Sequence, residues 1–132
     1  MPGSPAAAYL DAVTVRNEAF RAIYDGRRRS LEEHKATVAS IATATGTFRG
    51  ALSALAFPAE AQVNASALIS QLEEQEAAWW TCARSTSRNE WESSRVRALE
   101  VDDAGHRLAM ALRADLGLRN DLGFVTQRDW QG

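Results

Sequence analysis

A stripe of mostly apolar residues at alternating spacings of three and four constrains this fold more than any other feature of the chain. It runs for nearly four heptads through Leu31, His34, Val38, Ile41, Thr45, Phe48, Leu52 and Leu55. Such a repeat places its members on one face of an α-helix, so the stripe predicts a long helix that buries this face against other helices. His34 and Thr45 interrupt the stripe, and we expect such buried polar residues to hydrogen-bond one another and fix the register of the packing.

Helix-capping and helix-breaking residues predict where this helix begins and ends, and they predict three further helices. Ser30 and Glu33 form a capping-box sequence at its start. Phe57-Pro58 ends it, because the residue before a proline disfavours the α conformation. The remaining signals are Ser4-Pro5, Asp25-Gly26, Ser87 with Glu90, and Gly117. Together they predict helices over about 5–25, 30–56, 59–86 and 88–116.

The same periodicity predicts the inward face of each of the other three helices. The first helix turns inward Leu10, Val13, Asn17, Phe20 and Tyr24. The third turns inward Ala61, Ala65, Leu68, Leu72, Gln75, Trp79 and Cys82, and the fourth Trp91, Ala98, Val101, Gly105, Leu108 and Leu112. Small residues on these faces let two helices approach each other closely.

Four helices joined by short connections favour antiparallel neighbours. We therefore expect an all-α, up-down-up-down four-helix bundle over residues 1–118, followed by an irregular tail at 119–132. The main alternative is a pair of helical hairpins exchanged between two subunits. The chain of 132 residues is long enough for one core, and its single cysteine, Cys82, forms no internal disulfide.

Composition and missing motifs reduce the range of functions. With 15 basic and 17 acidic side chains the net charge is −2, so we expect no nucleic-acid partner. The longest apolar runs span only a few residues, so we expect no membrane span. The chain contains no Gly-rich phosphate loop, Cys-x-x-Cys, Gly-x-Ser-x-Gly or His-Glu-x-x-His motif. We therefore expect no cofactor and no catalytic residues.

Two side-chain pairs are candidates for chemistry. Asp103 and His106 are spaced to share a helix face, but a single pair falls short of a metal site, so we expect no bound metal. Cys82 and His34 occupy inward positions near the same end of adjacent helices, which would suit a nucleophile and its base. A cysteine on a packing seam is more often a small core residue, and no third orienting group is evident.

One constellation follows from the expected topology. An up-down-up-down bundle places the connection between the first two helices at the same end as that between the last two. This arginine-rich end gathers Arg27, Arg28, Arg29, Arg84 and Arg88. The N-termini of the second and fourth helices lie there too, and both helix N-termini and guanidinium groups bind anions. The sequence therefore predicts a site for a small anion or an acidic partner.

Aromatic residues are expected near the same end. Tyr24, His34, Trp79 and Trp91 would form the floor of a small pocket there. Acidic residues in the first turns of the second and fourth helices counter part of the positive field, namely Glu32, Glu33, Glu90 and Glu92.

The run from Phe48 to Val63, FRGALSALAFPAEAQV, followed by Leu68-Ile-Ser-Gln-Leu72, is the basis of a family resemblance. It resembles the central hairpin of Ala-rich actinobacterial exported proteins and lipoproteins, in which one helix ends at an aromatic-Pro-Ala-Glu turn and a second begins. The resemblance covers the middle third of the chain and implies a helical domain in the cell envelope. It implies no catalytic residues, and the lipid-attachment cysteine of such proteins has no counterpart here.

These observations favour a non-catalytic interaction or small-ligand-binding bundle, monomeric or homodimeric. Its partner is an unknown protein or a small anionic ligand. The alternative is a small helical enzyme that uses His34 or His106 with Cys82 or carboxylates. A secreted helical-hairpin protein ranks last, because the Trp-x-Gly turn of that class is absent. We expect an extracytoplasmic envelope location if a leader precedes this sequence, and a cytoplasmic one otherwise.

Replacing Arg27, Arg28 and Arg29 with serine tests the arginine-rich end. Because these positions lie between helices, the melting temperature should barely change, whereas saturable stabilisation by phosphate or small carboxylates should weaken. A thermal-shift titration measures both effects. Anion binding that survives the replacement would refute this site.

Overall fold

The computed structural model describes residues 4–24 and 30–118. Its elements are α1 (Pro5–Ile23), α2 (Leu31–Ser53), the short 3-10 helix η1 (Ala59–Ala61), α3 (Gln62–Ala83) and α4 (Arg88–Asp115). The described ranges contain no strand. The predicted all-α fold of four long helices is confirmed, while the predicted tail at 119–132 lies outside the described residues.

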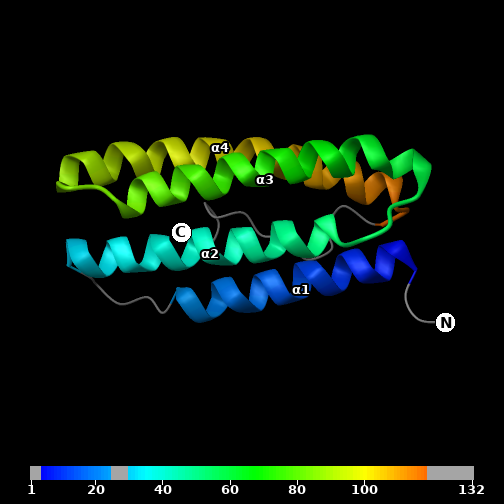
Figure 1. Cartoon of the computed structure of the whole chain (residues 1–132), viewed down its shortest axis with the longest axis horizontal. Coiled ribbons are helices and arrows are strands. Elements are labelled where there is room, and N and C mark those ends of the chain that lie inside the picture. The colour runs from blue at the N-terminus through cyan, green and yellow to red at the C-terminus, as the bar shows by residue number, and fades with distance from the viewer. Residues whose placement is uncertain (1–3, 25–29, 119–132) are drawn as a thin grey trace.

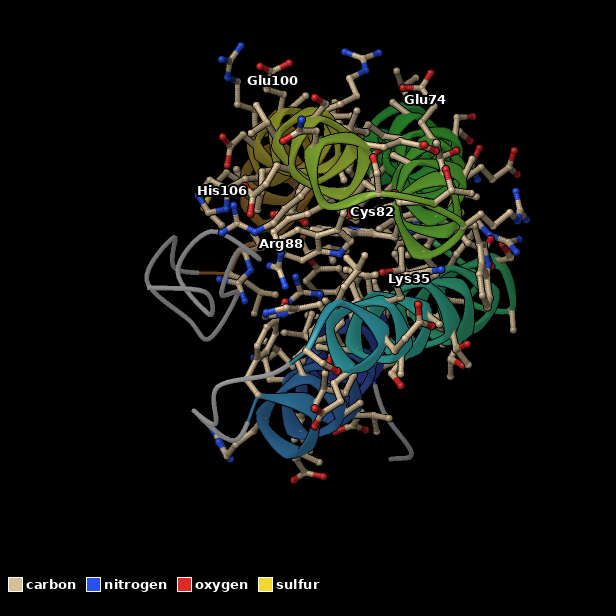
Figure 2. The ribbon with its side chains drawn as sticks, turned by 90° about the vertical axis from the view of Figure 1, so that its left-hand side faces the viewer. Lys35, Glu74, Cys82, Arg88, Glu100 and His106 are labelled. Carbon is tan, nitrogen blue, oxygen red and sulfur yellow. The ribbon has the colours of Figure 1, made fainter. Side chains whose placement is uncertain are left out.

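The helices pack in chain order. Figure 1 shows successive helices running in opposite directions along one long axis. The closest backbone contacts join α1 to α2, α2 to α3 and α3 to α4, whereas α1 and α4 approach each other far less. Viewed along the bundle in Figure 2, α1 and α2 form one side and α3 and α4 the other. Helix α3 therefore lies between two neighbours, and α1 lies at the edge.

Side chains cap three of the four long helices at their N-termini. The Ser4 hydroxyl accepts a hydrogen bond from the Ala7 amide at 3.1 Å, with proline at the first helical position. The Ser30–Glu33 capping box is confirmed, with its two reciprocal bonds at 3.1 and 3.2 Å. At α4 the Ser87 hydroxyl accepts from the Glu90 amide.

The second predicted capping box forms only in part. The Glu90 carboxylate accepts a bond from the Thr86 hydroxyl at 2.9 Å, in place of the expected bond from the Ser87 amide. The Thr86 hydroxyl, one residue before the N-cap Ser87, thus replaces the Ser87 amide as the donor to the Glu90 carboxylate.

As predicted, Gly117 terminates α4, whose last helical residue is Asp115. This glycine has φ +73°, in the left-handed region that suits a residue without a Cβ. The Gly117 amide donates to the Ala114 carbonyl and the Leu118 amide to the Arg113 carbonyl, at 3.1 and 2.9 Å. These two bonds form a Schellman motif, and Leu118 then packs against the core.

The inward faces of α2 and α3 agree with the periodicity. All seven residues predicted for the third helix are buried, with Ala61 contributed by η1. The middle of the α2 stripe, from Val38 to Leu52, is buried, while His34 near its start and Leu55 beyond its end are half-buried. Apolar periodicity therefore located the core of the two central helices.

The inward faces of α1 and α4 differ from the prediction. On α1 the buried residues are Tyr9, Val13, Arg16 and Phe20, so Tyr9 and Arg16 take the places expected for Leu10 and Asn17. On α4, Ala109 is buried while the predicted Leu108 is only half-buried. Asp102 and Arg113 are buried on α4 as well. Buried charged residues do not contribute to an apolar pattern, which explains why the burial of Arg16, Asp102 and Arg113 was not predicted.

A polar contact joins α3 to α4 inside the bundle. The Gln71 amide donates to the Val101 carbonyl, and the Gln75 amide donates to the Gln71 side-chain oxygen, both at 2.5 Å. A Cβ at Gly105 would collide with both glutamine side chains. The absence of a side chain at Gly105 therefore leaves room for Gln71 and Gln75 to form these hydrogen bonds against α4.

Replacing Leu52 or Phe48 with alanine should lower the free energy of unfolding by about 2–5 kcal/mol, because each leaves a cavity in the core. Leu52 is fully buried, and 3% of Phe48 is exposed. Val63→Ala is the control, since that valine is 80% exposed and should change stability by no more than about 0.5 kcal/mol. Urea unfolding followed by tryptophan fluorescence measures all three. Equal effects at Leu52 and Val63 would contradict the assigned core.

Candidate functional site

The structure describes two of the five arginines assigned to the arginine-rich end. Arg84 and Arg88 are exposed at the connection between α3 and α4, and Arg88 is labelled in Figure 2, which looks along the bundle from this end. Arg27, Arg28 and Arg29 lie outside the described residues. The N-termini of α2 and α4 share this end, as Figure 1 shows, and the α2 terminus already binds a carboxylate of its own. The anion site there stays a prediction.

The aromatic residues expected near that end pack largely into the core. Trp79 is fully buried and Trp91 is 6% exposed, in one cluster with Phe20 and Val38, against which Tyr24 packs. The His34 ring lies against Trp91, with 4.7 Å between ring centroids. The structure thus brings these aromatic residues together, with both indoles inside the packed interior.

The Cys82 thiol has the environment of an unreactive core residue. It is fully buried, and its sulfur donates to the Trp91 carbonyl oxygen at 3.6 Å. Burial raises the pKa of the Cys82 thiol to about 11. Since the nucleophile is the thiolate, a thiol that stays protonated at neutral pH is poorly suited to catalysis.

The other candidate pair, Asp103 and His106, is half-buried on α4. Within residues 4–24 and 30–118, no group of three or more His, Cys, Asp or Glu side chains is placed to hold a metal ion.

No helix of these ranges is both long enough and apolar enough for a membrane crossing.

Polar side chains occupy the wide side of the bundle between α1 and α4. Arg16, Asp102 and Arg113 are all at least 96% buried, and Tyr9 is fully buried. Burial lowers the pKa of Arg16 to about 10, an effect that the Asp102 carboxylate and Tyr9 oppose and Arg113 reinforces. Burial also raises the pKa of Tyr9, against the influence of Arg113. Charged and polar side chains therefore fill part of the interior between two helices whose backbones make few close contacts.

Aromatic rings and an amide hold the Arg16 side chain in place. Its guanidinium carbon lies 4.8 Å from the ring centroid of Phe20 and 5.7 Å from that of Phe48. Nη1 donates to the Asn17 side-chain oxygen at 2.8 Å. This guanidinium is thus enclosed between two helices, where cation–π contacts offset part of its desolvation.

A groove of about 690 Å³ runs between α1 and α2 on the outside of the bundle. The α1 wall is formed by Ala8, Asp11, Ala12, Val15, Ala19 and Ile23, and the α2 wall by Ala39, Ser40, Thr43, Ala44, Thr47, Ala51 and Leu55. Arg16 and Phe48 complete the lining. The volume falls within the range of known ligand sites, and the walls consist mainly of small or apolar side chains.

The hydroxyl groups on the α2 wall already have hydrogen-bond partners. Ser40 donates to the Ala36 carbonyl at 3.2 Å, Thr43 to Ala39 at 3.0 Å, and Thr47 to Thr43 at 3.1 Å. Each bond joins a side chain to the backbone one turn earlier, so no wall hydroxyl needs water as an acceptor. These three wall hydroxyls therefore leave no donor unpaired when water is excluded.

The groove was missed in the sequence because each helix was assigned a single apolar stripe. Helix α1 carries a second stripe of Ala8, Ala12, Val15, Ala19 and Ile23, at spacings of 4, 3, 4 and 4. Residues 36–48 of α2 contain no charged side chain. A second stripe on α1 beside an uncharged stretch of α2 was the available signal.

Comparisons with known protein families, with curated proteins and with solved structures found no match to this chain. Its function is therefore inferred from the chemistry of the described residues.

The raised pKa of Cys82 predicts a specific loss of stability in alkali. A thiol with a pKa of about 11 in the folded chain and about 9 when unfolded contributes stability that is complete below pH 9. That contribution is lost as the pH rises through 11. Unfolding free energies measured by urea titration between these pH values should fall more steeply for the wild type than for Cys82→Ala. Parallel pH profiles would contradict a buried, protonated thiol.

Proposed function

We propose that this protein is a non-catalytic interaction bundle that binds the apolar face of a helix in the groove between α1 and α2. The observation that carries the proposal is a long groove of small side chains whose wall hydroxyls are already hydrogen-bonded. Binding through a helix in an apolar groove is a common mode of protein recognition.

The dimensions of the groove suit a helix. Its α1 wall extends from Ala8 to Ile23. Fifteen residue steps of a helix span about 22 Å, or roughly four turns. Alanine, serine and threonine in both walls allow a third helix to approach α1 and α2 at the short distances seen in close helix packing.

Burial of the groove would leave few polar groups without partners. A buried donor that loses its hydrogen bond costs about 1–3 kcal/mol. Ser40, Thr43 and Thr47 avoid this penalty, because each hydroxyl keeps its bond to the α2 backbone when water is excluded. The walls therefore favour an apolar occupant over a polar one.

The proposal includes two further features, an acidic partner and a location in the cell envelope. Arg84 and Arg88, both exposed, remain candidates for contact with an acidic partner or a small anion. The cell envelope remains the location that the family resemblance implies. The form of the enzyme alternative that uses Cys82 is less well supported, because the raised pKa of Cys82 disfavours the thiolate that a nucleophile requires.

Site-specific photocrosslinking in the native cells tests the groove. A photoreactive benzophenone residue in place of Thr43, which is exposed on the groove wall, should give discrete protein adducts. The same residue in place of Ala104, exposed on α4 outside the groove, should not. Adduct formation is read from mass-shifted bands after denaturing electrophoresis.

A groove substitution supplies the second control. Ser40→Glu adds a charge to the exposed rim, and it should suppress the Thr43 adducts while leaving the fold unchanged by circular dichroism. Ala104→Glu should leave these adducts intact. Equal adduct yields at both benzophenone positions, or adducts indifferent to Ser40→Glu, would overturn the proposal.

A further inference from the structure

We propose that the helix bound in the α1–α2 groove carries basic residues along one edge of its apolar face. The partner is then a positively charged amphipathic helix. This inference rests on the proposed function, because it names the chemistry of the occupant of the same groove.

The α1 rim of the groove is acidic. Asp11 belongs to the α1 wall, and Glu18 follows it seven residues later; both side chains are exposed. Seven residues make about two helical turns, so the two carboxylates share one edge of α1 at a separation of about 10 Å along the axis. Within the described part of the chain, neither carboxylate has an ion-pair partner. Two negative charges are therefore available to a helix lying in the groove.

Three basic residues of the described ranges lie close to this rim in the sequence, and none of them forms an ion pair with it. Lys35 on α2 lies 3.7 Å from the Glu32 carboxylate. Arg21 is exposed on α1 three residues after Glu18, yet no ion pair joins the two, and at 100° per residue Arg21 lies about 80° around the helix from Asp11, on the side away from the groove wall. Arg16 lines the groove, yet only 4% of it is exposed. Among the described residues, the exposed charge on the α1 edge of the groove is thus negative.

The apolar part of the groove lies directly beside this acidic edge. Val15, which is 58% exposed, stands between Asp11 and Glu18 along α1. The opposite wall offers small side chains at Ala44 and Thr47. A matching helix therefore needs larger apolar residues facing the small wall and a basic edge facing α1. Complementary charges of this kind select the partner and fix its orientation more than they add affinity.

The same charges disfavour a second copy of this chain as the occupant. If α1 of another copy lay antiparallel on this α1 with the two Val15 side chains near the centre, Asp11 of each copy would face Glu18 of the other. Like charges placed opposite each other oppose association. We therefore expect the isolated chain to remain a monomer.

Binding of two matched peptides tests the basic partner. Both are amphipathic helices of about 18 residues with the same leucine and alanine face, flanked by lysine in one peptide and by glutamate in the other. Fluorescence anisotropy of the labelled peptides, measured with the full chain at low ionic strength, should show about tenfold tighter binding of the lysine peptide. The preference should shrink as salt is added, because exposed charges are screened. Equal binding of both peptides would overturn the basic partner.

A charge reversal on the rim assigns the preference to its residues. Asp11→Lys combined with Glu18→Lys should reverse the order of the two peptides. The matched control is Glu73→Lys with Glu74→Lys on α3, which changes the net charge by the same amount at exposed positions outside the groove. The control should keep the wild-type preference, and circular dichroism checks that both variants fold. A control that reverses the order as well would overturn the assigned rim.

A substitution at Val15 tests the apolar part of the contact. Val15→Glu should abolish binding of the lysine peptide, even though it adds negative charge, because it disrupts the packing surface. Val96→Glu on α4, where the valine is 49% exposed outside the groove, should bind this peptide as the wild type does. Stronger binding by Val15→Glu would reveal attraction by charge alone and overturn a helix seated in the groove.

Failure of this inference is distinguishable from failure of the proposed function. Groove-specific Thr43 adducts in cells, together with peptides bound equally, would overturn the basic partner and retain the helix-binding groove. An absence of both adducts and peptide binding would overturn both. Sedimentation equilibrium gives a further outcome: a mass that rises from 14.4 kDa toward twice that value, and that Val15→Glu holds at the monomer, would identify a second copy as the occupant instead.

Discussion

Burial of one face of α3 is the interaction on which the rest of this bundle depends. Both core clusters use it: Leu68 and Leu72 pack in one, and Trp79 and Cys82 in the other. Complete burial of each large apolar side chain contributes about 1.5–3 kcal/mol. Since α2 and α4 both pack on α3, these three helices form the part of the fold with the most extensive helix contacts.

Helix α1 stands in a different relation to the core. Its backbone packs on α2, and toward α4 it presents Arg16 and Tyr9, near the buried Asp102 and Arg113. Buried charges stabilise a fold less reliably than apolar packing, because they lose their hydration. Val13 and Phe20 also anchor α1 in the two core clusters, and its second apolar stripe, which only partly packs against these clusters, forms one wall of the groove. The candidate binding surface therefore follows from the position of α1 in the fold.

Apolar periodicity was sufficient wherever apolar burial decides the structure. It identified every apolar inward residue of α3 but missed the buried Gln71, and the capping sequence at Ser30 fixed the start of α2. It failed at Arg16 and Asp102, since these two charges influence each other across the fold and Arg16 also lies over the ring of Phe48 on α2. The groove was also out of reach, because a wall made from two helices is defined only once their relative rotation is known. Interruptions of a hydrophobic stripe thus indicate polar burial without revealing the partner.

The polar side chains of α3 also restrict what can change on its neighbours. Glu76 passes across Gly46 on α2 to reach Arg49 at 3.1 Å, and a Cβ at Gly46 would strike its carboxylate. Gly105 stands in the same relation to Gln71 and Gln75 on the α4 side. During evolution, alanine at position 105 should therefore occur together with a shorter side chain at 71 or 75. Such paired substitutions in related sequences would show that the side chains of α3 restrict which residues α2 and α4 can carry.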